Sequence, residues 1–409
     1  MAEDDGTHTA SGAAYHPAEP HVLEDPAAAH HALRATCPVH RTEALGRPLY
    51  SLSLAEDVHA VLTDPGLWSN RRGPGIGDSS GGAGDMQHDD PPEHGRRRGF
   101  VRDWFLPAAV DRLEPQLRTL CEDLVDAMRA RGRGDLCAEL AQPLPVTSFC
   151  AIMGVELGDR ERFLQWADAL VVSMAFPGEG GDARRAISTF TLAEVDRRRR
   201  LADEGGPPHP DGLLTHLALD VYADGARMDR REVVNLCNQL LIAGHETSTS
   251  LLTNCVWRLL EDRPGRWERL LEQPELVPNV IEESLRFDPP VLGLCRTNTR
   301  DTEVRGVEVP EGSKVMVLYA SANRDATRFA DPDTFRIDRP LAQAKRHYSF
   351  STGIHHCLGA HLARLTGRVA LETLLSRLPD LRLDGVTERV ASPFLWGRKR
   401  LPVAWDAPA

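Results

Sequence analysis

The sequence predicts a mainly helical protein with a small β lobe, folded as one domain. Helical periodicity of apolar residues dominates from about residue 93 to residue 261. Alternating valines and glycine turns over residues 294–319 predict short strands instead. No linker or break in composition divides residues 38–405, and 41% of the chain is hydrophobic, enough for one large core. We therefore expect a disordered tail over residues 1–20 and a single domain over residues 21–409.

Taken in chain order from residue 24, the first elements are a short helix, a strand pair around residues 47–54 and a helix over residues 55–63. Residues 69–92 (SNRRGPGIGDSSGGAGDMQHDDPP) predict a long loop, which in a compact fold usually covers or binds something. The periodicity then predicts helices over residues 93–105, 107–131, 138–153, 158–174, 182–203, 211–220, 229–261, 275–287 and 359–377. A last hairpin is expected between residues 391–394 and 401–405.

Composition and charge exclude several classes of function. The net charge is −12, and phosphate backbones attract basic surfaces, so we expect no nucleic-acid partner. The eight cysteines have no regular framework spacing, which predicts reduced thiols. The acidic, polar N-terminus has no apolar core, and no run of about 18 apolar residues occurs, so we expect a soluble, cytoplasmic protein without a membrane anchor.

The segment Phe350-Ser-Thr-Gly-Ile-His-His-Cys-Leu-Gly359 is the most informative part of the chain. It places Cys357 in a loop just before an apolar helical run, between Gly353 and Gly359, where the backbone can turn tightly and approach a flat ligand. Phe350 can keep water from the sulfur, and His355 can point toward an anionic group. A single thiolate held in this way suits axial ligation of haem iron.

Two other interpretations of this segment stay open at this point. Cys357 can be an ordinary buried thiol, as most single cysteines are. It can also belong to a zinc site together with His355, His356 and His361, although zinc sites usually need a separated second ligand pair, which the chain does not supply.

The spacing F-x-x-G-x-H-x-C-x-G resembles the haem-binding loop of the cytochrome P450 family, and all five fixed positions are met. Ser351 stands where many relatives have glycine. The resemblance extends over about residues 24–405, with further motifs in the family's order. It implies the cytochrome P450 fold, with haem b (iron protoporphyrin IX) as cofactor and Cys357 as the ligand of the iron.

The helix predicted over residues 229–261 contains Ala243-Gly-His-Glu-Thr, where Gly244 weakens the helix and Thr247 can hydrogen-bond to a carbonyl one turn earlier. We expect a local bulge or kink. The segment resembles the family's A-G-x-E-T motif. The resemblance implies that the kink makes room for dioxygen and that Glu246 and Thr247 deliver protons. The alternative is a helix whose polar residues pack against a neighbouring loop.

Glu283 and Arg286 stand three residues apart on one predicted helix and can pair on its surface. The family resemblance implies instead a buried network of Glu283, Arg286 and Arg339 that fixes the cysteine loop. It also implies that the haem propionates are held by His94, Arg98, Arg296 and His355. The resemblance places the substrate among mostly apolar residues, namely Leu240, Ala243, Val291, Leu292, Leu294, Phe394 and Leu395.

No phosphate-cradling G-x-G-x-x-G follows a strand, so electrons are expected from a separate ferredoxin and an NAD(P)H-dependent ferredoxin reductase. The residues expected to meet an acidic ferredoxin are basic and flank the cysteine side, namely Arg96, Arg97, Arg102, Lys345, Arg346, Arg364 and Arg368.

The resemblance implies a monomeric monooxygenase that uses O2 to hydroxylate or epoxidise a small to medium, largely apolar substrate, in bacterial specialised metabolism. The alternatives are atypical oxidation on the same fold (C–C or C–O coupling, nitration, peroxygenase chemistry) and a non-catalytic, haem-containing recruitment domain.

Overall fold

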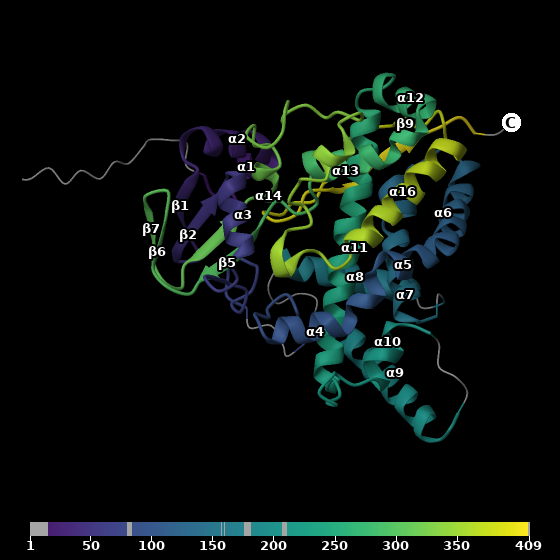
Figure 1. The fold of residues 1–409 in the computed structure, drawn as a ribbon. Coiled ribbons are helices and arrows are strands. Elements are labelled where there is room, and N and C mark those ends of the chain that lie inside the picture. Colours follow the sequence, from purple (N-terminus) through teal and green to yellow (C-terminus); the bar gives the residue numbers. More distant parts are fainter. Residues whose placement is uncertain are drawn as a thin grey trace, which may run out of the picture.

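The computed structural model describes residues 15–79, 84–156, 158, 160–175, 181–206 and 211–407. Figure 1 shows a helical body around the long helix α11 (Arg230–Leu260), with a small β lobe at one end. The largest hydrophobic core lies among α6 (Glu114–Arg129), α11, α13 (Val277–Phe287) and α16 (Ala360–Arg377). The predicted fold class, mainly α with a small β lobe, is therefore confirmed.

The main sheet of the β lobe has five strands in the order β1-β2-β8-β5-β3. Their bounds are β1 Val39–Ala44, β2 Arg47–Leu52, β8 Lys314–Val317, β5 Leu294–Asn298 and β3 Trp68–Ser69. β2 and β8 are parallel, and the other neighbours are antiparallel. Side chains alternate between its faces: Tyr50 and Val315 pack on one face, and Leu49 and Met316 on the other.

The predicted helices occur in the predicted order, and several short helices stand beside them. The helices not yet named are α1 Pro20–Glu24, α2 Pro26–Thr36, α3 Ala55–Thr63, α4 Glu93–Val101, α5 Pro107–Val110, α7 Pro143–Met153, α8 Arg160–Ala175, α9 Gly181–Asp203, α10 Leu213–Leu219, α12 Gly265–Glu272, α14 Tyr319–Ala322 and α15 Leu341–Ala344. Short 3₁₀ turns cover Arg102–Phe105, Asp111–Leu113, Pro274–Leu276 and Gly353–His355, and a π-helical turn covers Cys137–Ala141.

The central helix is not broken at residues 243–248, because α11 runs from Arg230 to Leu260 as one α-helix. The predicted kink of this helix stays a prediction. Its N-terminus has a capping box, in which Asp229 accepts from the backbone N–H groups of Arg231 and Glu232. The Thr247 hydroxyl does donate to the Ala243 carbonyl at 2.6 Å. That carbonyl can accept a second hydrogen bond, so the side chain bonds to it while the helix stays continuous.

Both ends of the chain differ from the predictions. Tyr15 is buried against His30, so residues 15–20 belong to the folded lobe rather than to the expected tail; residues 1–14 lie outside the described part. The predicted last hairpin is also wrong. The Phe394 carbonyl accepts from Leu292 N at 2.7 Å, so this segment joins the edge of the β lobe instead.

The C-terminal strands pair elsewhere. β10 (Glu388–Arg389) pairs with β11 (Arg398–Arg400), and β12 (Pro402–Ala404) lies between β4 (Arg133–Asp135) and β9 (Arg382–Leu383). A separate pair, β6 (Thr302–Val304) and β7 (Val307–Val309), forms the hairpin at the edge of the β lobe.

The predicted loop over residues 69–92 is hydrogen-bonded to the β lobe near its start and to α11 further along. Lys314 Nζ on β8 donates to the carbonyls of Arg72 and Gly73 at 2.8 and 2.7 Å. Met86 N donates to Gln239 Oε1 on α11 at 3.1 Å. The loop therefore connects the β lobe with the central helix; residues 80–83 lie outside the described part.

Across the described ranges, no helix has the length and hydrophobicity needed to cross a lipid bilayer.

Candidate active site

The cysteine loop is shaped by backbone contacts. Cys357 N donates to the Phe350 carbonyl at 2.8 Å, which closes the loop just before α16. Gly353 has φ +68°, and a Cβ at this position would lie 2.3 Å from the Leu62 carbonyl oxygen, so glycine is required there. Ser351, two residues before it, also has a left-handed backbone, with φ 57°.

The Cys357 thiol lies deep in the molecule, and yet its side chain is exposed to an interior space. Burial raises the pKa of this thiol, while a backbone N–H at Gly359 and the charges of Arg98 and Arg364 act in the opposite direction. Those neighbours favour the thiolate, which is the form that binds metal.

Small residues line this space, so a ligand can approach the backbone closely. Ala243 is exposed although it lies in the middle of helix α11. A Cβ added to Gly244 or Gly359 would meet no atom within 4 Å. Leu240 on α11 and Leu358 beside the cysteine pack on the same hydrophobic cluster. A flat ligand that is coordinated by sulfur fits in this space.

Cationic and imidazole side chains converge beside the cysteine loop. Arg296 on β5 is 4% exposed, and its Nη1 donates to the Cys295 carbonyl at 2.9 Å. The rings of His94 and His355 lie 4.3 Å apart. His355 Nε2 is buried and has no hydrogen-bond partner among the described residues. Burial, then the charge of Arg296, lowers the pKa of His355.

Within the described part of the chain, no carboxylate pairs with Arg296, so this buried guanidinium fits an anionic ligand. Arg98 lies near the same group, and its Nη2 donates to the His356 carbonyl at 2.6 Å. A ligand with two carboxylates, such as the two propionates of haem, would suit this set of donors.

The predicted acid–alcohol pair lies on α11. Thr247 is half-buried and bonds to the carbonyl of Ala243, the residue that faces the interior space. Glu246 is half-buried and accepts from Ser250 Oγ at 3.2 Å. The pair therefore lies beside the interior space, where a hydroxyl and a carboxylate can exchange protons.

Glu283, Arg286 and Arg339 are brought together in a buried network, which excludes the surface-pair alternative. Their side chains are at most 1% exposed. Glu283 accepts from Arg286 Nε and Nη2 at 2.8 and 2.7 Å and from Arg339 Nε at 2.8 Å. Arg286 Nη1 also donates to the Pro332 carbonyl at 2.7 Å, which ties α13 to the segment leading to the cysteine loop.

A second buried network was not predicted from the sequence. Glu282 accepts from His347 Nε2 at 3.0 Å and from Arg364 Nε at 2.5 Å. The sequence signal was present in the doubled glutamate of Glu282-Glu283 and in a histidine three residues before Phe350.

The predicted substrate residues lie in different environments. Val291, Leu294 and Phe394 are half-buried, as Leu240 is on α11, whereas Leu292 and Leu395 are fully buried.

Five of the seven basic residues predicted to meet a redox partner also form ion pairs within the protein. These pairs are Arg96–Asp224, Arg97–Glu232, Arg102–Asp103, Arg364–Glu282 and Arg368–Glu114. Arg102, Lys345 and Arg346 are exposed, and the partner Asp103 of Arg102 is exposed as well. Docking of a redox partner on this patch stays a prediction.

The zinc alternative gains no support. His361 Nε2 lies 2.7 Å from Asp111 Oδ1, away from the proposed ligand set. In the described ranges, no group of three or more His, Cys, Asp or Glu side chains is placed to hold a metal ion. No disulfide joins the eight cysteines, all of which lie in the described ranges.

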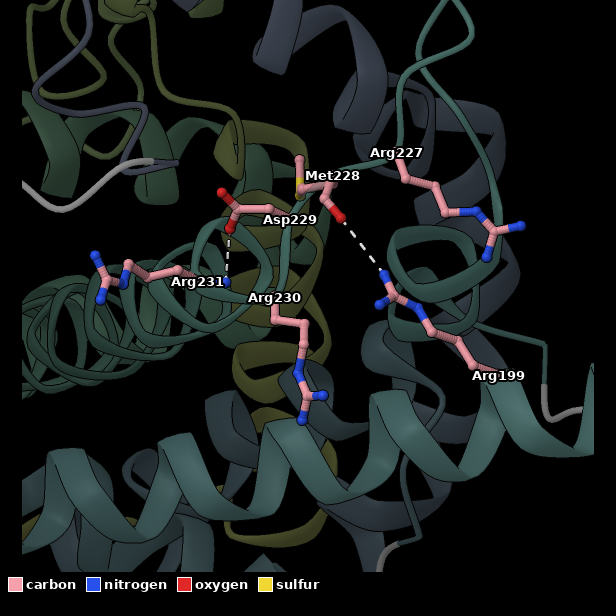
Figure 2. A pocket seen from close by; sticks show the side chains of 6 residues that line it. All are labelled: Arg199, Arg227, Met228, Asp229, Arg230 and Arg231. Carbon is pink, nitrogen blue, oxygen red and sulfur yellow. Dashed lines mark hydrogen bonds between the residues drawn. The ribbon is translucent and has the colours of Figure 1, made fainter.

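A separate hollow of about 590 Å³ lies between α9 and the first turn of α11 (Figure 2). It is lined by Arg199, Arg227, Met228, Asp229, Arg230 and Arg231. Arg230 pairs with Asp196 at 2.6 Å, and Arg199 Nε donates to the Ala218 carbonyl at 2.9 Å. About 24 Å of helix, at about 1.5 Å per residue, separates this end of α11 from Thr247, so the hollow is not part of the cysteine site.

Known proteins resemble this chain over nearly its whole length. The family model "Cytochrome P450" matches residues 268–380. The cytochrome P450 monooxygenase PikC of Streptomyces venezuelae is 34% identical over 391 residues, covering 93% of this chain and 91% of that protein. Mycinamicin IV hydroxylase/epoxidase of Micromonospora griseorubida is 34% identical over 388 residues, covering 91% and 94%.

The structure of the cytochrome P450 PksS of the bacillaene polyketide synthase of Bacillus subtilis matches with a TM-score of 0.85 and 28% identity, covering 96% of this chain and 100% of that one. Likeness of this extent, in sequence and in fold, shows that this chain belongs to the cytochrome P450 family and is one of its monooxygenases, with haem iron as its cofactor.

Proposed function

We propose that this monooxygenase binds haem b through Cys357 and hydroxylates or epoxidises a small to medium, largely apolar substrate. The observation that carries the proposal is the placement around one interior space of the Cys357 thiol, the exposed Ala243 of α11 and the Arg296 guanidinium, which pairs with no carboxylate among the described residues. The relatives named for hydroxylation and epoxidation support the reaction type and a role in bacterial specialised metabolism.

Haem, when bound, supplies the activation of dioxygen, for which a thiolate ligand donates electron density to the iron. Cys357 would be that ligand, kept in place by its backbone bond to Phe350. The propionates would be held by His94, Arg98, Arg296 and His355. The protein thus contributes ligation, charge compensation and orientation.

Protons would reach the interior space along α11. Glu246 would take up protons from the solvent side and pass them through water to the Thr247 hydroxyl, which both donates and accepts hydrogen bonds. Because both residues are present, monooxygenation is favoured over a non-catalytic recruitment domain.

The substrate would contact the half-buried apolar residues Leu240, Val291, Leu294 and Phe394, with Ala243 beneath it. Leu292 and Leu395, which are fully buried, would support this wall from behind. Few polar groups lie among these side chains, so the substrate is largely apolar.

We further propose that the enzyme acts as a cytoplasmic monomer and receives electrons from an acidic ferredoxin and its NAD(P)H-dependent reductase. The exposed cations that remain on the cysteine side, Arg102, Lys345 and Arg346, would form the docking surface.

The reaction is tested by following NAD(P)H and O2 consumption with a generic ferredoxin and reductase in the presence of candidate substrates. We expect Thr247→Ala to form about one tenth or less of the wild-type product per NAD(P)H consumed, with hydrogen peroxide released instead, because proton delivery contributes a factor of about 10² or more. Thr247→Ser keeps the hydroxyl and should restore most of the coupling. Equal coupling in wild type and Thr247→Ala would contradict the assigned role.

A further inference from the structure

We propose that Glu282, Arg364 and His347 form a charge-balancing network that sets the reduction potential of the haem through the Cys357 loop. This role differs from that of the Glu283 network, which holds the loop in place. The inference rests on the proposed ligation by Cys357.

The network is a buried carboxylate with two donors. The Glu282 side chain on α13 is 3% exposed, and that of His347 is 1% exposed. Arg364 on α16 donates to Glu282 Oε1 from Nε at 2.5 Å and to Oε2 from Nη2 at 3.1 Å. His347 Nε2 lies 3.0 Å from Oε2.

The structure defines the charge of each member. Ser349 N donates to His347 Nδ1 at 3.1 Å, so the proton of the ring is on Nε2, which donates to Glu282. Burial lowers the pKa of His347 despite the neighbouring carboxylate, which keeps the ring neutral. Burial would raise the pKa of Glu282, but its bonds to His347 and Arg364 dominate and lower it to about 2. The network is therefore one anion paired with one cation.

The network reaches the cysteine through Phe350. The guanidinium carbon of Arg364 lies 4.5 Å from the centre of the Phe350 ring, and the His347 ring lies 5.6 Å from it. The Phe350 carbonyl accepts the backbone N–H of Cys357. The charge of Arg364 therefore lies against the ring of the residue whose carbonyl holds the Cys357 amide.

Electrostatics then predicts the sign of each effect. Reduction adds one electron to the haem, and a nearby positive charge stabilises that state, whereas a nearby negative charge destabilises it. In the intact pair the two charges largely cancel. Removing the Glu282 charge leaves Arg364 unbalanced and raises the potential, whereas removing the Arg364 charge leaves Glu282 unbalanced and lowers it.

The test is a spectroelectrochemical titration of haem-loaded protein, with Glu282→Gln, Arg364→Gln and the double variant. We expect a higher midpoint potential for Glu282→Gln, a lower one for Arg364→Gln and a value near that of wild type for the double variant. Shifts of the same sign, or no shift in either single variant, would overturn the inference, because a merely structural role does not produce opposite signs.

Arg368→Gln is the matched control. Arg368 lies one turn further along α16, is 31% exposed against 28% for Arg364, and pairs with Glu114. Its substitution should leave the potential unchanged. If Arg364→Gln does not hold haem, Arg364→Lys keeps the charge and should keep the potential while losing stability; a lowered potential in this variant would contradict the account.

Failure of this inference is distinguishable from failure of the proposed ligation. A wild-type protein without the spectrum of a thiolate-ligated haem contradicts the ligation. A normal spectrum with unmoved potentials contradicts only the role of the network.

Discussion

Single residues determine the shape of the cysteine loop. Gly353 has a left-handed backbone and lies so close to Leu62 that no side chain fits. Ser351 adopts a left-handed backbone as well, with φ 57°, and its buried hydroxyl has no hydrogen-bond partner among the described residues. For an L-residue other than glycine this conformation costs about 1–2 kcal/mol.

We predict that Ser351→Gly raises the free energy of unfolding by about 0.5–1 kcal/mol, because relief of the left-handed conformation exceeds the added entropy of glycine in the unfolded chain. Urea denaturation of the haem-loaded protein measures this change. Ser349→Gly is the control: it removes the bond from Ser349 Oγ to the Leu285 carbonyl and should destabilise the protein. A Ser351→Gly protein less stable than wild type would show that the serine is not strained.

At the scale of elements, buried charges join segments that are distant in the sequence. Glu283 and its arginines tie α13 to the segment before the cysteine loop. Lys314 ties β8 to the loop after β3, and it is fully buried. Such charges are costly to bury, so each is bonded to several partners.

We predict that Arg286→Ala destabilises the protein by about 3–5 kcal/mol, because Glu283 would be left buried with one cation fewer. The haem content after purification and the urea midpoint measure this loss. Arg336→Ala removes an exposed arginine of the same segment and is the control. Normal haem loading in Arg286→Ala would contradict the structural role of the network.

Lys314 gives a prediction for pH dependence. Burial lowers the pKa of this amine from 10.5 to about 8. Between these values the unfolded chain binds a proton that the folded protein has released, so the wild-type free energy of unfolding should rise with pH relative to that of Lys314→Met. Below about pH 8 the difference in the free energy of unfolding between wild type and Lys314→Met should not change with pH.

Urea unfolding of both proteins over this pH range is the measurement. Lys345→Met, at an exposed lysine, should follow wild type throughout. Parallel curves for wild type and Lys314→Met would show that the Lys314 pKa is not lowered by folding.

Much of the site could be predicted from the sequence, because its motifs are local in the chain. The cysteine loop, the Thr247 bond to Ala243 and the Glu283–Arg286 pair each depend on spacings of a few residues. The partners of Arg364 and Lys314, which are distant in the sequence, were missed. Nothing in the sequence near Arg364 or Lys314 shows that Glu282 or the Arg72 carbonyl lies beside it.

At the scale of the whole molecule, the distribution of charge decides where a redox partner can dock. The chain carries a net charge of −12, and most arginines near the cysteine side are neutralised by carboxylates. Arg346 and Arg102, whose partner Asp103 is exposed too, face solvent and can steer an acidic partner.

We predict that Arg102→Glu together with Arg346→Glu raises the ferredoxin concentration for half-maximal turnover several-fold at low salt, and that added salt reduces the difference, because such steering is screened. Steady-state turnover against ferredoxin concentration is the measurement. Arg41→Glu, on β1 in the β lobe, is the control and should behave as wild type. An unchanged ferredoxin dependence in the double variant would remove this surface from the account.

The central claim, ligation of haem by Cys357, is tested most directly by the absorption spectrum of the dithionite-reduced, carbon-monoxide-bound protein. Wild type and the control Cys37→Ala should share a strongly red-shifted Soret band, and Cys357→Ala should lose it. A wild-type protein without haem, or a band that persists in Cys357→Ala, would contradict the claim.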